Sequence, residues 1–102
     1  MVMKGTTMTL TFNDCLYALR KRYGIVMDDS GQYPQMHTWA NKKYSIELYE
    51  TYLGQIRLFV MPLDDIMNDK FYDIRTVEDI YSALDPLADA ITVRQTLLLE
   101  AA

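Results

Sequence analysis

The chain has 102 residues, of which 50% are apolar and 24% are charged, a composition typical of one globular domain and unlike that of a disordered chain. The single cysteine, Cys15, excludes an internal disulfide and favours a reducing compartment. No apolar run of signal-peptide length follows Lys4, and the longest apolar stretch, residues 58–63, is too short to span a bilayer. We therefore expect one compact domain over residues 1–102, located in the cytoplasm.

The net charge of −4 is unevenly divided along the chain. Residues 1–63 carry seven basic and five acidic side chains, whereas residues 64–89 carry eight acidic side chains and two basic ones. Because phosphate contacts require a basic surface, direct binding of nucleic acid is not expected. An acidic region instead attracts partners with a basic surface.

The first expected element is a helix over residues 12–23. Thr11 can cap the free amides of its first turn, Asp14 lies where a negative charge is favoured, and Gly24 is suited to end it. The cations at 20–22 lie where the helix dipole favours positive charge. An apolar stripe recurs at helical spacing: Phe12, Cys15, Leu16 and Leu19. Cys15 is therefore expected to be a buried structural thiol.

Three strands are expected next, at residues 35–40, 44–49 and 55–61, after a possible small strand at 25–27 and a turn at 28–32. We expect a three-residue loop at 41–43 and a five-residue loop at 50–54. These loops pair Ala40 with Tyr44 and Leu48 with Ile56, and in this register the large apolar residues share one face of the sheet. They are Tyr44, Ile46, Leu48, Ile56, Leu58 and Val60.

The other face of the sheet is expected to carry three rows of side chains, with Glu47 opposite Arg57. The rows are Trp39, Ser45 and Phe59, then His37, Glu47 and Arg57, and then Gln35, Tyr49 and Gln55. A shift of either register by two residues would preserve these faces.

The C-terminal part is expected to hold one helical turn at 63–69, a short extended piece at 71–74 and a helix capped by Thr76. A third helix is expected from Pro86 to about Leu99, and a single helix kinked at Pro86 is the alternative. The order α-β-β-β-α-α predicts an α+β fold. It would be a three-stranded antiparallel meander with an N-terminal helix and two C-terminal helices on one face.

Few residues suggest chemistry. The sequence has no glycine-rich phosphate loop, no paired cysteines and only one histidine, so we predict no catalytic site, no metal site and no cofactor. The acids between 64 and 73 lack the glycine and the ligand spacing of a calcium-binding loop. The row of His37, Glu47 and Arg57 leaves open a small enzyme or enzyme subunit with a histidine base.

The size, the acidic second half and the aromatic sheet face favour a non-catalytic protein-interaction module. We expect it to inhibit a partner protein that has a basic surface and handles nucleic acid, as phage anti-defence proteins, anti-CRISPR proteins and immunity proteins do. We expect no membrane partner. A homodimerising structural subunit is a further alternative. The residues expected to bind the partner are Trp39, Phe59, Tyr49, Arg57, Asp64, Asp65 and Asp69.

Overall fold

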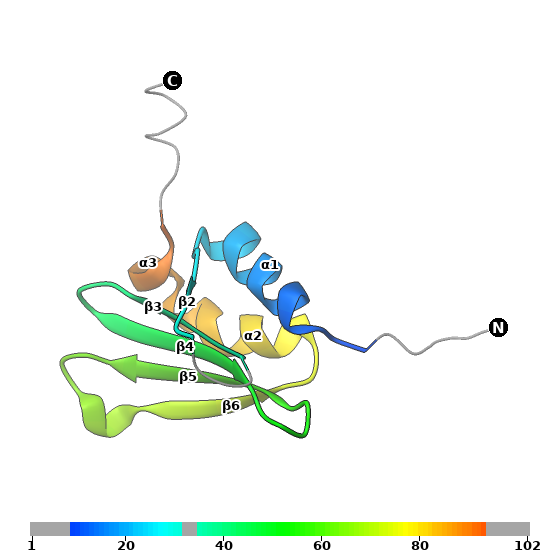
Figure 1. Ribbon diagram of the computed structural model, residues 1–102. Coiled ribbons are helices and arrows are strands. Elements are labelled where there is room, and N and C mark those ends of the chain that lie inside the picture. Colours follow the sequence, from blue (N-terminus) through cyan, green and yellow to red (C-terminus); the bar gives the residue numbers. More distant parts are fainter. Residues whose placement is uncertain (1–8, 32–34, 94–102) are drawn as a thin grey trace.

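The protein has an α+β fold in which helices cover one face of a five-stranded antiparallel sheet (Figure 1). The computed structural model describes residues 9–31 and 35–93. The strand order is β2-β3-β4-β5-β6, so each strand pairs with its neighbours in sequence. The strands are β2 (Asp28–Asp29), β3 (Gln35–Ala40), β4 (Tyr44–Glu50), β5 (Ile56–Pro62) and β6 (Lys70–Ile74). The helices are α1 (Phe12–Tyr23), α2 (Val77–Leu84) and α3 (Ala88–Ile91), with short 3-10 turns η1 (Ile66–Asn68) and η2 (Asp85–Leu87).

The predicted three-stranded sheet was therefore too small, because β2 and β6 add one edge strand on each side. The expected strand at 25–27 is irregular, and the two-residue β2 forms instead within the expected turn. The extended piece expected near 71–74 is β6, and the short η1 connection returns it antiparallel to β5. Pairing with β5 gives these five residues the backbone partners that a sequence pattern alone does not reveal.

Helix α1 begins and ends where the sequence predicts. The Thr11 hydroxyl accepts a hydrogen bond from the Asp14 amide at 3.0 Å, and the Asp14 carboxylate accepts one from the Thr11 amide at 3.0 Å. This reciprocal pair satisfies two amides that the helix leaves free. Gly24 adopts a left-handed conformation with φ 69°, and its amide donates to the Arg20 carbonyl at 2.9 Å.

The C-terminal helices differ from the prediction beyond Leu84. The predicted cap of α2 is confirmed, since the Asp79 carboxylate accepts the Thr76 amide at 3.1 Å in a capping box. Instead of one helix from Pro86, the chain forms η2 and then the single turn α3, which ends at Ile91. Thr92 is extended, and the Val93 amide donates to the Tyr23 carbonyl at 2.7 Å, which ties the chain to the end of α1. The part of the expected helix at 94–99 lies outside the described residues.

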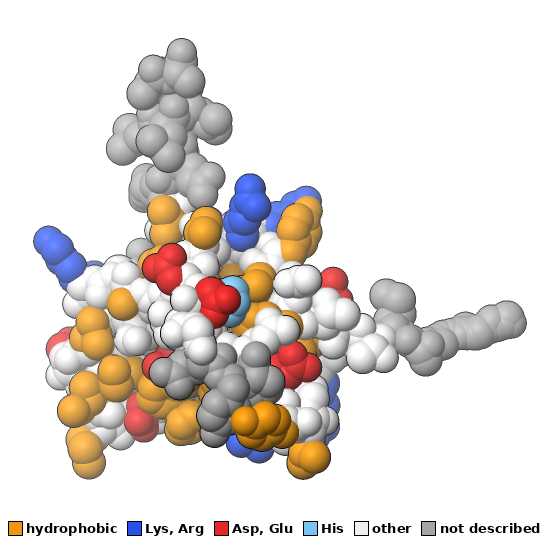
Figure 2. Space-filling model, viewed as in Figure 1, with side chains coloured by type: hydrophobic (Ala, Val, Ile, Leu, Met, Phe, Trp, Pro, Cys, Tyr) orange, Lys and Arg blue, Asp and Glu red, His pale blue; other side chains and the backbone are white. Residues whose placement is uncertain are grey.

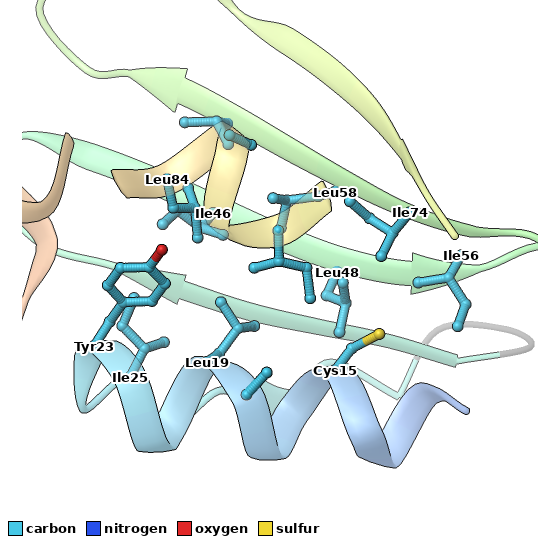
Figure 3. Close-up of a cluster of buried hydrophobic side chains, with 14 of the residues drawn as sticks. Cys15, Leu19, Tyr23, Ile25, Ile46, Leu48, Ile56, Leu58, Ile74 and Leu84 are labelled. Carbon is cyan, nitrogen blue, oxygen red and sulfur yellow. The ribbon is translucent and has the colours of Figure 1, made fainter. Parts of the chain in front are cut away.

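The hydrophobic core lies between the helices and one face of the sheet (Figure 3). Leu19 of α1 and Leu84 of α2 are fully buried against Ile46, Leu48 and Leu58 of the sheet. The predicted core face is thus confirmed, with Tyr44 partly buried at its margin.

The register of β4 with β5 keeps the predicted faces but is shifted by two residues. Leu48 lies opposite Leu58 rather than Ile56, and Glu47 lies opposite Phe59 rather than Arg57. The connecting loop has the predicted length but occupies 51–55, one residue later than expected. Thr51 closes this loop, because its amide donates to the Gln55 carbonyl at 2.8 Å and its hydroxyl accepts the Gln55 amide at 3.1 Å.

The predicted register of β3 with β4 was wrong by one residue. Ala40 lies opposite Ser45, not Tyr44, because Asn41 itself takes part in the pairing. The Asn41 amide donates to the Tyr44 carbonyl at 2.9 Å, and its side-chain oxygen accepts the amides of Lys43 at 2.7 Å and Tyr44 at 2.8 Å. Only Lys42 and Lys43 remain at the tip of the hairpin. A shift of one residue moves every side chain of β3 to the other face of the sheet.

Candidate interaction surface

The face of the sheet that points away from the helices is called the open face below. In Figure 1 the helices lie on the opposite side of the sheet, and no helix or strand within residues 9–31 and 35–93 covers the open face. The strand registers assign its side chains. They are Asp28, Met36, Thr38, Ala40, Ser45, Glu47, Tyr49, Arg57, Phe59, Met61, Phe71 and Asp73.

Two phenylalanines lie side by side on the open face, next to its β6 edge. Phe59 and Phe71 are cross-strand partners on β5 and β6, with ring centroids 4.5 Å apart and ring planes inclined by 35°. Phe71 is 63% exposed even though its ring packs on Phe59. Aromatic pairs of this geometry are favourable in a sheet, and an exposed aromatic ring offers a large area for contact with a partner.

A polar row runs beside the two phenylalanines. Arg57 lies opposite Tyr49 on one side and Asp73 on the other, and its guanidinium Nε is 3.1 Å from the Asp73 carboxylate. A hydrogen bond with the Tyr49 side chain, followed by the charge of Asp73, raises the pKa of Arg57. These contacts hold the guanidinium over the sheet with donors still facing solvent, where it can meet an acceptor on a partner.

The connection between β5 and β6, residues 63–69, is called the acidic connection below. All of its side chains are exposed, and three are large and apolar: Leu63, Ile66 and Met67. Asp64, Asp65 and Asp69 alternate with these apolar residues, and the Asp65 carboxylate accepts a hydrogen bond from the Asn68 side chain at 2.7 Å. Figure 2 shows hydrophobic side chains gathered along the lower side of the molecule, over the region of β5 and β6. Exposed apolar groups that are bordered by charge are typical of protein-binding surfaces.

The structure divides most of the residues that we expected to bind a partner between two places. Phe59, Tyr49 and Arg57 lie on the open face, and the three predicted aspartates lie in the acidic connection at one end of the same sheet. Phe71 was not among the residues expected to bind a partner. A strand at this position would place Phe71 and Tyr72 on opposite faces of the sheet, which is the signal that could have found it.

Trp39 is the exception. The corrected register places it opposite Ile46 on the helix-covered face, where its half-buried ring packs against the core. Its predicted place on the open face is therefore wrong, and the reason is the Asn41 turn.

His37 also lies on the helix-covered face. Its ring packs on Phe12 of α1 with centroids 5.2 Å apart, and its buried Nδ1 has no hydrogen-bond partner among the described groups. Glu47 points to the open face, so the predicted row of His37, Glu47 and Arg57 does not exist. The geometry gives the histidine no carboxylate from Glu47 to orient it as a base.

Two further groups with reactive side chains have structural environments. Cys15 is fully buried in the core, as predicted, and burial together with the nearby charges of Asp14 and Glu50 raises the pKa of its thiol to about 12. Arg22 binds the Asp85 carboxylate through two hydrogen bonds of 3.0 and 2.8 Å. The Tyr23 hydroxyl donates to the same carboxylate at 2.6 Å, which joins α1 to η2.

Within the described parts of the chain, no group of three or more histidine, cysteine, aspartate or glutamate side chains is arranged to hold a metal ion. No helix there is long and apolar enough to cross a membrane. No family model matches the chain, and no curated protein or solved structure is significantly similar to it.

Proposed function

We propose that the protein is a non-catalytic interaction module that blocks a partner protein with a basic, nucleic-acid-binding surface. The observation that carries this proposal is the exposed Phe71 ring, which packs on Phe59 on a sheet face that the described helices leave uncovered. Residues that dominate protein interfaces are often aromatic or arginine side chains near the centre of a buried patch. Phe71, Phe59, Tyr49 and Arg57 would serve as these anchors.

Charge supports the choice of a basic partner. The acidic connection carries three aspartates and no cation. Carboxylates beside an apolar surface would attract lysine and arginine side chains that otherwise bind phosphate groups. The protein would then act by occupying the nucleic-acid site of its partner, in the manner of an anti-defence or immunity protein.

The proposal can be tested by affinity capture from the host, followed by binding measurements with the purified partner. Phe71→Ser removes the exposed ring, and Asp64→Asn with Asp69→Asn removes two charges from the acidic connection. A matched control, Glu78→Gln with Asp89→Asn, changes the net charge equally on exposed positions of α2 and α3.

We expect Phe71→Ser to weaken binding by more than about tenfold, which corresponds to about 1.4 kcal/mol. The paired aspartate variant should reduce both the association rate and its dependence on salt, whereas the matched control should change neither. A captured partner with an acidic contact surface, or equal affinity for all variants, would contradict the proposal. If light scattering shows that Phe71→Ser dissolves a dimer of this chain, the open face is a homodimer interface instead.

A further inference from the structure

A recess lies on the helix side of the molecule, away from the open face. It is a cleft of about 460 Å³ between α1 and α2, within the range of about 300–1,000 Å³ that is usual for small-molecule sites. Leu10, Ala18 and Val77 line it with apolar surface, and the ring of Tyr81 forms part of the same lining. The proposed partner surface leaves this cleft unused.

Contacts behind the cleft hold its aromatic wall in place. The Arg22 guanidinium lies over the Tyr81 ring, 4.1 Å from its centroid, and is itself bound by the Asp85 carboxylate. The Tyr23 ring meets Tyr81 edge-on with centroids 6.5 Å apart. A ring held from two directions keeps its position when the cleft is empty, which lowers the entropy cost of binding a ligand.

Three charged side chains line the cleft, and two of them are cations. The carboxylate of Asp14 is committed to the Thr11 amide in the capping box of α1. Lys21 has its ammonium 3.4 Å from the Tyr17 hydroxyl, and Arg75 forms no ion pair with a carboxylate of the described residues. The cleft thus combines an apolar lining with two cations whose charge is not neutralised by an ion pair there.

We propose that this cleft binds a small amphipathic carboxylate. The alkyl chain would lie along Leu10, Ala18 and Val77, and the carboxylate would meet Lys21 and Arg75. An arginine donates paired hydrogen bonds that match the two oxygens of a carboxylate. A neutral or cationic ligand with the same alkyl chain would gain the apolar contacts but not this pairing.

The test is a titration of the whole protein with decanoate, followed by the amide resonances in nuclear magnetic resonance spectra. Below the micelle concentration, we expect saturable shifts at residues of α1 and α2 that line the cleft, with a dissociation constant on the order of 1 mM or tighter. Shortening the chain to octanoate and then hexanoate should weaken binding by up to about fourfold for each methylene removed. Decanol and decyltrimethylammonium should bind less tightly than decanoate.

The two cations can be tested against a matched control. Lys21→Met with Arg75→Met should weaken decanoate binding by about fivefold or more, whereas Lys42→Met with Lys43→Met, at the hairpin tip, should leave it unchanged. Shifts that map to the open face, no saturable binding, or equal binding of decanoate and decyltrimethylammonium would overturn the inference. None of these results depends on the open face, so the cleft can fail while the proposed function stands.

Discussion

Whether the open face is free can be decided by comparing Leu58→Ala with Phe71→Ala. Leu58 is fully buried on the helix side of β5, so truncation creates a cavity and should cost about 3 kcal/mol of the free energy of unfolding. Phe71 is 63% exposed, so only about a third of its ring is removed from water by this chain. Full burial of such a ring stabilises by up to about 3 kcal/mol, and Phe71→Ala should therefore cost about 1 kcal/mol.

Urea unfolding measures both changes. The free energy of unfolding of a small protein falls by about 1–3 kcal/mol per molar urea. Leu58→Ala should therefore lower the urea concentration at the unfolding midpoint about three times as far as Phe71→Ala, and neither variant should change the slope of the free energy against urea. The stability should not depend on protein concentration for either variant. If Phe71→Ala costs as much as Leu58→Ala, Phe71 is buried in solution, and the idea of a free face is refuted. A concentration-dependent midpoint would identify a second copy as the cover.

Three other outcomes follow from the geometry. Trp39→Ala should lower the free energy of unfolding by about 2 kcal/mol and leave partner affinity unchanged, since the ring packs against the core. Reduced affinity without a loss of stability would show instead that Trp39 contacts the partner. The bonds from Arg22 and then Tyr23 lower the pKa of Asp85 to about 2, below its value in the unfolded chain. This carboxylate therefore stabilises the fold above about pH 4, and the stabilisation is lost as the pH falls toward 2. Asp85→Asn should make the melting temperature less dependent on pH between about 4 and 2, and an unchanged dependence would argue against the hydrogen bonds from Arg22 and Tyr23. The raised pKa and burial of Cys15 predict that Ellman's reagent reacts slowly in the native protein and rapidly in urea, whereas fast native labelling would show that the core opens there.

Helix α1 and the start of α2 could be predicted from sequence because their signals are local. Thr11 and Gly24 lie within one turn of the ends of α1, and Thr76 directly precedes α2. The β4–β5 faces were also predictable, because a shift of two residues leaves the apolar set of Ile46 and Leu58 on the same side.

The β3–β4 pairing could not be predicted from alternation alone. Its outcome depends on whether Asn41 belongs to the loop or to the pairing, and three hydrogen bonds made by this one residue decide it. The error put Trp39 and His37 on the wrong face of the sheet, whereas the expected face of Phe59 and Tyr49 was right. The place of β6 in the sheet was missed for a different reason, since the extended piece at 71–74 becomes a sheet strand only when β5 lies beside it.

The bond between Arg22 and Asp85 joins residues 63 positions apart, and all five strands lie between them in the chain. The core therefore closes only when α1 meets the segment after α2. The chain loses the conformational entropy of this long loop before the contact can stabilise the fold. Folding should be cooperative, and slower than in a helical bundle of the same length. A cut anywhere in the sheet would leave α1 and α2 on separate fragments. Fragment complementation would then test whether the two fragments can assemble without the covalent chain.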